Sequence, residues 1–592
     1  MAPPIRRPSR YTEIEHAQDK RATLKRLSAY FIEEKIKLLF MFVVVVIGAL
    51  SGIFAPSYQS EAVDIITKNN GELLTSIIMM LSLYLLQSLC QLIQGLLGAH
   101  LGQNIVKRLR EDLFSRIIDL PIKYLDTHSH GDLMSRMTND IENISINASR
   151  ALIFLFSGLL SIVGTASIML WYCWQLALLS FSSVLLTLAV SHFLAAKVLQ
   201  YSREQQDLMG KLNGNIEEMI SGYRTVVAYN HQKISVNNFC SISDKLTEAG
   251  IKTEIYSGVT GPLINGISNI VFVIIAAFGG YFAIKGIISI GVISAFIVYV
   301  KQFSQPINEL GQIYGQLQSA VAGAERVFAI IDRPIEDRAG EDLEKCDETS
   351  ITLEGVNFSY VSQKQILRNL NLKIEPGQKI ALVGSTGSGK TTVANLLLRF
   401  YDVDSGRISI NSQDLKTISR PSLRKNIAIV LQDTILFSDT IYNNLLYANK
   451  EATPETLSQT LDSSHCREFI ERLPLGLQTV LEKGGTNLSH GQRQLLSIAR
   501  AFIADPKILI LDEATSSVDT RTEKNIQSAM QKVMHNRTSI VIAHRLFTIR
   551  DADLIVVLDQ GQVVEQGHHL QLLEQKGRYY QLYMSQFAGF ET

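Results

Sequence analysis

Residues 384–391 combine the side chains and the spacing that bind a nucleotide phosphate. They read GSTGSGKT, which fits the pattern G-x-x-x-x-G-K-[ST], and they lie between the apolar run 380–383 and the helix-like stretch 392–398. Glycine lets backbone N–H groups approach phosphate oxygens, and the following helix N-terminus adds positive charge. A glycine-rich turn that binds nothing does not explain Lys390, a cation for phosphate, or Thr391, a hydroxyl for Mg²⁺. The predicted contacts are Gly384, Ser385, Thr386, Gly387, Ser388, Gly389, Lys390, Thr391 and Thr392.

Two further candidates follow apolar runs that are typical of buried strands. Asp512 and Glu513 come directly after residues 508–511, and α/β sheets bind ligands at the carboxyl ends of their strands. Asp512 suits Mg²⁺ held through water, and Glu513 suits the orientation or deprotonation of an attacking water. His544 follows residues 538–543, where it can hydrogen-bond a γ-phosphate. Paired acids are usually solvated and a lone histidine is usually structural, but the repeated position at strand ends favours catalysis.

The composition limits the classes of function that this chain can have. Its 592 residues exceed one ordinary domain, and 46% of them are hydrophobic, which points to a membrane portion. The formal net charge is zero, so there is no electrostatic case for a nucleic-acid partner. The five cysteines are scattered without any C-x-x-C spacing. They indicate neither a disulfide framework nor a zinc site.

Uncharged stretches predict six membrane spans within residues 38–318. Residues 38–60 and 73–106 each exceed the ~20 apolar residues that cross a bilayer. Residues 151–196 are long enough for two spans, with a turn at the aromatic stretch 171–175. Residues 255–284 form a fifth span. The sixth runs from 286 to about 308 if Lys301 snorkels or faces an aqueous cavity.

The charges of the loops predict the orientation of the spans. Residues 107–150 and 197–254 are rich in Lys and Arg, so we expect both segments on the cytoplasmic side of the inner or plasma membrane. Their helical pattern extends the spans into the cytoplasm, with tips near 121–131 and 221–232 that are free to touch another domain. Within the N-terminal segment 1–37, residues 21–37 predict an amphipathic helix at the inner membrane surface, with a solvated helix as the alternative.

The second half of the chain predicts a different fold class. Residues 332–350 are polar, acidic and broken by proline and glycine, so we place a linker at 319–348. Residues 349–592 alternate short strands with helices. The expected fold is a membrane all-α six-helix domain with long cytoplasmic extensions, followed by an α/β P-loop ATPase domain with a mixed sheet.

This combination resembles the ATP-binding cassette family, and within it the bacterial multidrug exporters that fuse one six-span domain to one cassette. The match covers nearly the whole chain. Besides the phosphate loop it rests on Tyr360, on Gln432 in VLQD, on LSHGQ at 488–492, and on SSVD at 516–519 after Glu513. The resemblance implies an ATP hydrolase coupled to transport, with ATP and Mg²⁺ as cofactors.

The resemblance also implies roles for individual residues. Tyr360 would stack on adenine, and Gln432 would contact the metal and the γ-phosphate. The signature of one cassette would close over the ATP of another, and the residues expected to contact nucleotide there are Ser489, Gly491, Gln492 and Asp519. A plain helix cap explains Ser489 but leaves Gly491 unexplained. One chain has one loop and one signature, so a second half-transporter chain is required.

Three questions stay open at this point. The signature has His490 where the family usually has a glycine, which marks either a tolerated change or a weaker ATP site. The second chain is either an identical copy or a different half-transporter. We expect export of an amphipathic or hydrophobic small molecule or lipid across the lipid bilayer by alternating access. An ATP-gated channel or regulator and an importer are the alternatives.

Overall fold

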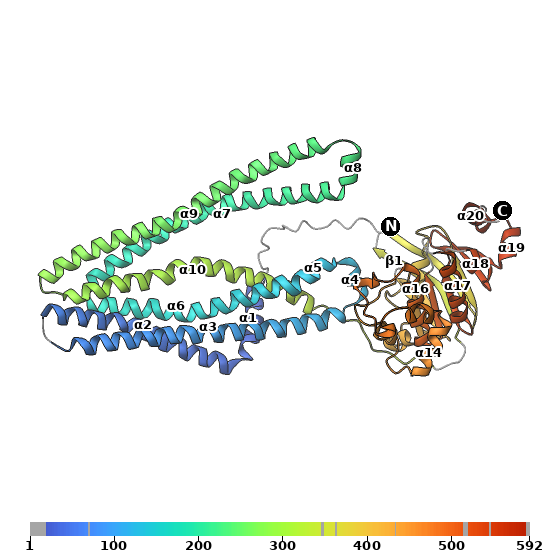
Figure 1. Ribbon diagram of the computed structural model, residues 1–592, viewed down its shortest axis with the longest axis horizontal. Coiled ribbons are helices and arrows are strands. Elements are labelled where there is room, and N and C mark those ends of the chain that lie inside the picture. The colour runs from blue at the N-terminus through green and yellow to red at the C-terminus, as the bar shows by residue number, and fades with distance from the viewer. Residues whose placement is uncertain are drawn as a thin grey trace. The chain divides into compact units, whose positions relative to one another are not determined.

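A computed structural model describes residues 19–68, 71–344, 349–361, 364–432, 434–512, 519–543 and 546–587 (Figure 1). The chain divides into two compact units. The helical unit comprises Ala2–Leu120 and His128–Pro334, and the α/β unit comprises Pro121–Thr127 and Ile335–Thr592. The short helix α4 (Ile122–Thr127) therefore packs with the α/β unit, although it lies between two long helices of the helical unit in sequence.

The helical unit consists of long helices joined by turns and by short helices (Figure 1). They are α1 (Lys20–Ile32), α2 (Lys35–Lys68), α3 (Leu73–Ile118), α5 (His130–Ser135), α6 (Ile141–Tyr172), α7 (Trp174–Ser221), α8 (Tyr223–Ala228), α9 (Gln232–Ile284) and α10 (Ile290–Ile331), with a π-helical turn at Arg136–Asp140. Within the described residues, six helical segments are long and apolar enough to span a membrane. The predicted six-span architecture is confirmed.

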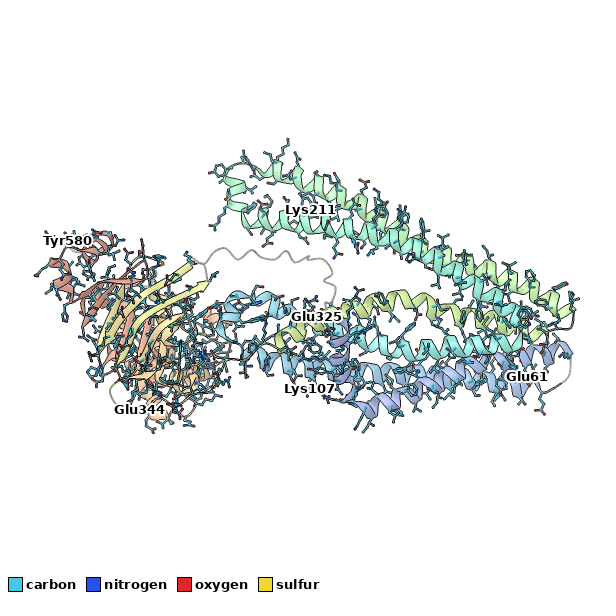
Figure 2. The ribbon with its side chains drawn as sticks, turned by 180° about the vertical axis from the view of Figure 1, so that it is seen from behind. Glu61, Lys107, Lys211, Glu325, Glu344 and Tyr580 are labelled. Atoms are coloured by element: carbon cyan, nitrogen blue, oxygen red, sulfur yellow. The ribbon has the colours of Figure 1, made fainter. Side chains whose placement is uncertain are left out.

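The long helices exceed the thickness of a bilayer. With 46 residues, α3 is about 70 Å long at 1.5 Å per residue, whereas the hydrocarbon core of a bilayer measures about 30 Å. Figure 2 shows Glu61 near one end of the helical unit and Lys107, Lys211 and Glu325 in its other half. The predicted turn at 171–175 is also confirmed, because α6 ends at Tyr172 and α7 begins at Trp174.

The N-terminal helix α1 covers the first part of the helix predicted at 21–37, since α1 ends at Ile32 and α2 begins at Lys35. The Asp19 side chain caps α1 by accepting a hydrogen bond from the Ala22 N–H. One face, with Leu27 and Phe31, is buried. Arg26 forms an ion pair with Asp332, which directly follows α10. The apolar face of α1 therefore packs within its own unit.

The α/β unit contains two sheets. The strands are β1 (Ile351–Val361), β2 (Lys364–Ile374), β3 (Lys379–Val383), β4 (Ser405–Ile410), β5 (Gln413–Asp414), β6 (Ile427–Val430), β7 (Ile508–Asp512), β8 (Thr538–Ile542), β9 (Leu554–Asp559) and β10 (Gln562–Gly567). One sheet is antiparallel, in the order β2-β1-β4-β5. The other has the order β10-β9-β3-β8-β7-β6, parallel except for the edge strand β10. The predicted mixed sheet is confirmed.

Helices cover the six-stranded sheet on both faces. They are α11 (Lys390–Leu397), α12 (Arg420–Asn426), α13 (Ile441–Leu446), α14 (Pro454–Ser463), α15 (Arg467–Glu471), α16 (His490–Ala504), α17 (Thr520–Met534), α18 (Leu546–Arg550), α19 (His569–Glu574) and α20 (Arg578–Phe587). Alternate residues of β3 enter different cores: Ile380 and Leu382 join one cluster, and Ala381 and Val383 join the other. Burial on both faces explains why these strands read as continuous apolar runs.

Candidate functional site

The phosphate loop lies between β3 and α11, and its glycines have backbone conformations that other residues rarely adopt. Gly384, Gly387 and Gly389 have φ values of 158°, 83° and 108°. A Cβ atom on Gly384 would lie 2.2 Å from the Leu558 carbonyl oxygen, and one on Gly389 would lie 2.6 Å from a Leu367 methyl carbon. The loop therefore requires glycine for its conformation and for its packing.

Polar groups converge inside this loop. Ser388 is 2% exposed, and its Oγ has no hydrogen-bond partner among the described residues. The Lys390 Nζ donates hydrogen bonds to the Gly384 and Ser385 carbonyl oxygens, at 2.7 and 3.1 Å. Burial lowers the pKa of Lys390, and the Asp512 carboxylate opposes this shift. An orphaned buried hydroxyl and a buried cation in a glycine cradle fit a phosphate group.

Tyr360 is positioned beside the helix that follows the loop. Its hydroxyl donates to Thr392 Oγ1 at 3.3 Å and accepts from Asn395 Nδ2 at 3.0 Å, and both partners belong to α11. The ring remains 37% exposed and packs edge-on against Phe358 and Tyr401. The structure thus brings Tyr360 next to Thr392 and leaves its ring accessible for stacking on a base.

The strand ends supply the candidate metal ligands. Asp512 ends β7, half-buried, and Gln432 is exposed shortly after β6. The two strands are parallel neighbours, so both side chains lie at the same edge of the sheet. Thr391 is in the first turn of α11 with an exposed side chain. Within the described ranges, no cluster of three His, Cys, Asp or Glu could hold a metal ion alone.

Two predicted catalytic residues lie outside the described residues. These are Glu513, which follows Asp512, and His544, which comes shortly after β8. The same holds for 516–518 of the SSVD motif, whereas Asp519 is described. Asp519 caps α17 by accepting a hydrogen bond from the Thr522 N–H at 3.0 Å. That backbone hydrogen bond lowers the pKa of Asp519.

The signature residues form a helix cap. Ser489 Oγ accepts from the Gln492 N–H at 3.2 Å, and the Gln492 side-chain oxygen accepts from the Ser489 N–H at 2.9 Å. This reciprocal capping box accounts for both residues structurally. Gly491 is buried in the first turn of α16, and His490 is half-buried. Ser489 is therefore a helix cap in this structure, which gives no role to Gly491, and the predicted nucleotide contact of Ser489 stays a prediction.

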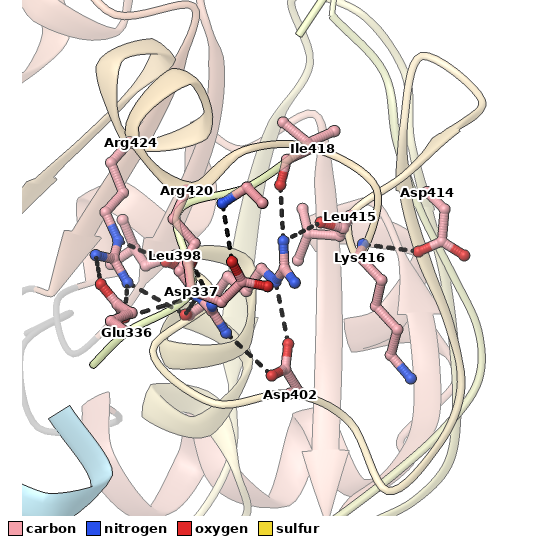
Figure 3. A network of polar contacts seen from close by, with 12 residues as sticks. Glu336, Asp337, Leu398, Asp402, Asp414, Leu415, Lys416, Ile418, Arg420 and Arg424 are labelled. Carbon is pink, nitrogen blue, oxygen red and sulfur yellow. Dashed lines mark hydrogen bonds and ion pairs between the residues drawn. The ribbon is translucent and has the colours of Figure 1, made fainter. Parts of the chain in front are cut away.

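The sequence analysis missed a network that fixes the start of the α/β unit (Figure 3). Arg424 forms two hydrogen bonds of 2.7 Å with the Glu336 carboxylate, and Arg420 donates to the Asp337 carbonyl oxygen at 2.7 Å. Buried Arg399 donates to the carbonyl oxygens of Leu415 and Ile418. The signal in the sequence was weak, since Glu336 and Asp337 lie in a polar stretch that otherwise reads as linker.

A second missed contact joins α4 to the α/β unit. The Tyr401 hydroxyl donates a hydrogen bond to the Asp126 carboxylate. Burial, reinforced by this carboxylate, raises the pKa of Tyr401 well above its ordinary value. Because Tyr401 also packs against Tyr360, with ring centroids 5.0 Å apart, one tyrosine contacts both α4 and the candidate adenine residue.

Comparisons with known proteins agree with this arrangement. A family model described as the ABC transporter transmembrane region matches residues 38–307, and one described as ABC transporter matches residues 367–516. The chain is 41% identical over 575 residues to the ABC transporter ATP-binding protein YfiC of Bacillus subtilis (strain 168), covering 96% of this chain and 95% of that protein. It is also 41% identical over 502 residues to a fatty acid ABC transporter ATP-binding/permease protein of Mycobacterium bovis, covering 85% of this chain and 80% of that protein.

A solved structure supports the same assignment over nearly the whole chain. The structure of a bacterial Atm1-family ABC exporter with ATP bound has a TM-score of 0.76 and 28% identity, and the alignment covers 94% of this chain and 99% of that one. The six membrane-type helices make the chain a multi-pass membrane protein. It belongs to the ABC transporter family, as a half-transporter of the exporter type that couples ATP hydrolysis to transport.

Proposed function

We propose that this chain pairs with a second half-transporter and exports an amphipathic or lipid-like molecule across the cytoplasmic membrane by alternating access. Two ATP sites would form between the cassettes, each with the phosphate loop of one chain and the signature helix α16 of the other. The Lys and Arg content of residues 107–150 and 197–254 supports a cytoplasmic location for the α/β unit and the N-terminus.

The hydrogen bond between Tyr401 and Asp126 carries this proposal. It ties α4, which connects two membrane-type helices, to the domain that holds the phosphate loop. Tyr401 also contacts Tyr360 at the adenine position. Tyr401 would therefore connect the adenine position with α4, which lies between two membrane-type helices in the sequence. Transport driven by rigid-body movement between two states needs a contact of this kind.

The residues of the α/β unit would divide the work of hydrolysis. Lys390, Ser388 and the loop N–H groups bind phosphate, while Tyr360 stacks on adenine. Thr391, Gln432 and Asp512 have the oxygen ligands that Mg²⁺ prefers, and that ion would neutralise phosphate charge. Glu513 would orient the attacking water and His544 would contact the γ-phosphate. Ser489, Gly491, Gln492 and Asp519 would complete the partner's site.

The first test is ATP hydrolysis by the chain alone in lipid nanodiscs, beside a Glu513→Gln variant. Steady turnover that Glu513→Gln abolishes is expected if two identical chains complete both ATP sites. A folded chain that binds ATP without turnover would require a different partner chain, and His490 is then the first residue to exchange for glycine. Lipid-analogue flux in proteoliposomes tests export itself, and flux that continues with Glu513→Gln held on ATP would overturn ATP-driven transport in favour of a gated channel.

A further inference from the structure

A cavity of about 230 Å³ with a mixed polar and apolar lining lies within the helical unit, between α2, α3, α6 and α10. The near absence of charge in these spans led us to expect an amphipathic or lipid-like cargo. The cavity nevertheless has amide groups on two facing helices. Its polar lining comes from Gln87, Gln91 and Gln94 of α3, from Gln302, Gln305 and Glu309 of α10, and from Ser157 and Ser161 of α6.

Two glycines of α2 allow the α3 amides to lie close against that helix. A Cβ atom on Gly52 would lie 2.6 Å from the Gln87 Nε2, and a Cβ atom on Gly48 would lie 3.2 Å from the Gln94 Nε2. Gly48 and Gly52 are one helical turn apart and both line the cavity. The wall of the cavity is therefore shaped to hold glutamine side chains, which makes their polarity a built feature of the site.

The amides of α10 are only partly satisfied. Gln302 donates from Nε2 to the Gly52 carbonyl oxygen at 3.1 Å, while its Oε1 is buried and has no hydrogen-bond partner among the described residues. Gln305 donates from Nε2 to the Glu309 Oε1 at 3.2 Å. A buried carbonyl oxygen without a donor is costly, so this site gains from a ligand, or from water, that donates hydrogen bonds.

The charge of the lining separates classes of cargo. Among the described residues that line the cavity there is no Lys, Arg or His, and Glu309 carries the formal charge. An anionic head group would meet a carboxylate without an opposing cation in the lining, and two like charges without a counter-ion are costly. A hydroxyl or amide head group can donate to Gln302 and accept from the other amides without that cost.

We propose that this cavity selects cargo with an uncharged head group rich in hydroxyls or amides, such as a monoacylglycerol, and rejects the carboxylate of a free fatty acid. This inference rests on the proposed function, because it concerns the cargo of the same exporter. Pockets for whole small ligands measure about 300–1,000 Å³. The smaller cavity therefore fits a head group, while the acyl chain lies on the apolar helix surfaces outside it.

The test is a binding measurement that does not depend on hydrolysis. The full chain in nanodiscs is cross-linked to a photoreactive monoacylglycerol, and the modified peptides are mapped. A monoacylglycerol and a fatty acid of the same chain length then compete with the probe. We expect cross-links in α3 and α10, and competition by the monoacylglycerol at about tenfold lower concentration than by the fatty acid. Equal competition by the two would overturn the inference.

Three variants sharpen this measurement. Gln302→Leu should lower the binding affinity for the monoacylglycerol about tenfold. Gln103→Leu, at an exposed position of α3 outside the lining, should leave that affinity unchanged. Gln91→Lys adds a cation at an exposed lining position and should shift the preference toward the fatty acid. ATP binding by each variant reports folding. A folded Gln302→Leu chain with unchanged selectivity contradicts the proposal.

The outcomes also separate this inference from the proposed function. Selective cross-linking in the cavity without ATP-driven flux supports the head-group site and overturns export. ATP-driven flux with no preference between the two head groups supports export and overturns the head-group site.

Discussion

The phosphate loop and the residues before α16 both lead into a helix N-terminus, where backbone N–H groups lack partners within the helix. The two regions differ in whether other polar groups there have hydrogen-bond partners. The loop holds a buried Ser388 hydroxyl without a partner in the described part of the chain, and a buried Lys390 whose Nζ donates to the backbone carbonyl oxygens of Gly384 and Ser385. The α16 terminus is closed by its own capping box. The difference teaches that the loop is ready for phosphate within one chain, whereas the signature helix is already stable without a ligand.

Removal of the loop cation is the strongest way to break this comparison. Lys390→Ala should lower ATP hydrolysis by about a hundredfold or more, because a buried charge aimed at the phosphates is lost. Lys373→Ala is the matched control, since Lys373 is exposed on β2 and pairs with Glu375. Hydrolysis rates and binding of a fluorescent ATP analogue are measured together. Equal rates in the two variants would remove Lys390 from the site.

The capping box offers a test of the other region. Ser489→Ala should destabilise α16 by about 1 kcal/mol through loss of the cap. Thr453→Ala removes a similar cap from α14, where Thr453 accepts from the Thr456 N–H. If Ser489 also contacts the partner's ATP, hydrolysis falls about tenfold in Ser489→Ala and stays unchanged in Thr453→Ala. Unfolding midpoints and hydrolysis rates are compared, and equal rates would leave Ser489 as a cap alone.

A smaller effect is expected at the contact between α4 and the α/β unit. Tyr401→Phe removes the hydrogen bond to Asp126 and keeps the ring against Tyr360. ATP affinity should persist. Flux per ATP hydrolysed should fall a few fold, because the variant loses one hydrogen bond to a charged group. Tyr442→Phe, at an exposed position of α13, serves as the control. Parallel assays in proteoliposomes measure the ratio of flux to ATP hydrolysis. An unchanged ratio in Tyr401→Phe would show that this contact does not couple hydrolysis to transport.

The smallest expected effect is the pH dependence of nucleotide binding. Burial depresses the pKa of Lys390 below its ordinary value of 10.5. The lysine is fully charged below the depressed pKa and loses its charge as the pH rises through it, so ATP affinity should fall in that window by about threefold. Lys390→Arg stays charged throughout and should give a flat profile. Titration with a fluorescent ATP analogue across alkaline pH checks this, and parallel profiles would rule out Lys390 as the titrating group.

The two regions also show what sequence reasoning reaches. The phosphate loop was predictable residue by residue, because its glycines and Lys390 act on neighbours within a few positions. Asp512 was predictable from the rule for strand ends. Contacts between distant segments were missed: Tyr401 and Asp126 are 275 positions apart, and the cavity glutamines come from α3 and α10. The spans were predicted from stretches without charged residues. Glutamine is polar but uncharged, so this criterion did not reveal the polar side chains within the spans.

Other predictions remain untested. Glu513 and His544 lie outside the described residues, so their catalytic roles rest on the sequence pattern alone. The domain boundaries at 38–318, 319–348 and 349–592 also remain predictions, although α10 continues to Ile331 and the network around Glu336 begins soon after it.

The proline content of the long helices gives them different mechanical stiffness. Proline interrupts α2 at Pro56, α9 at Pro262 and α10 at Pro306, and a helix bends most easily where proline removes a backbone hydrogen bond. The sequence of α3 contains no proline, and three residues, 119–121, separate this helix from α4. As a rod of about 70 Å, α3 turns a tilt of about 5° at one end into a displacement of about 6 Å at the other. If the unit moves, α3 would transmit a tilt along its length with less bending than α10, which contains Pro306.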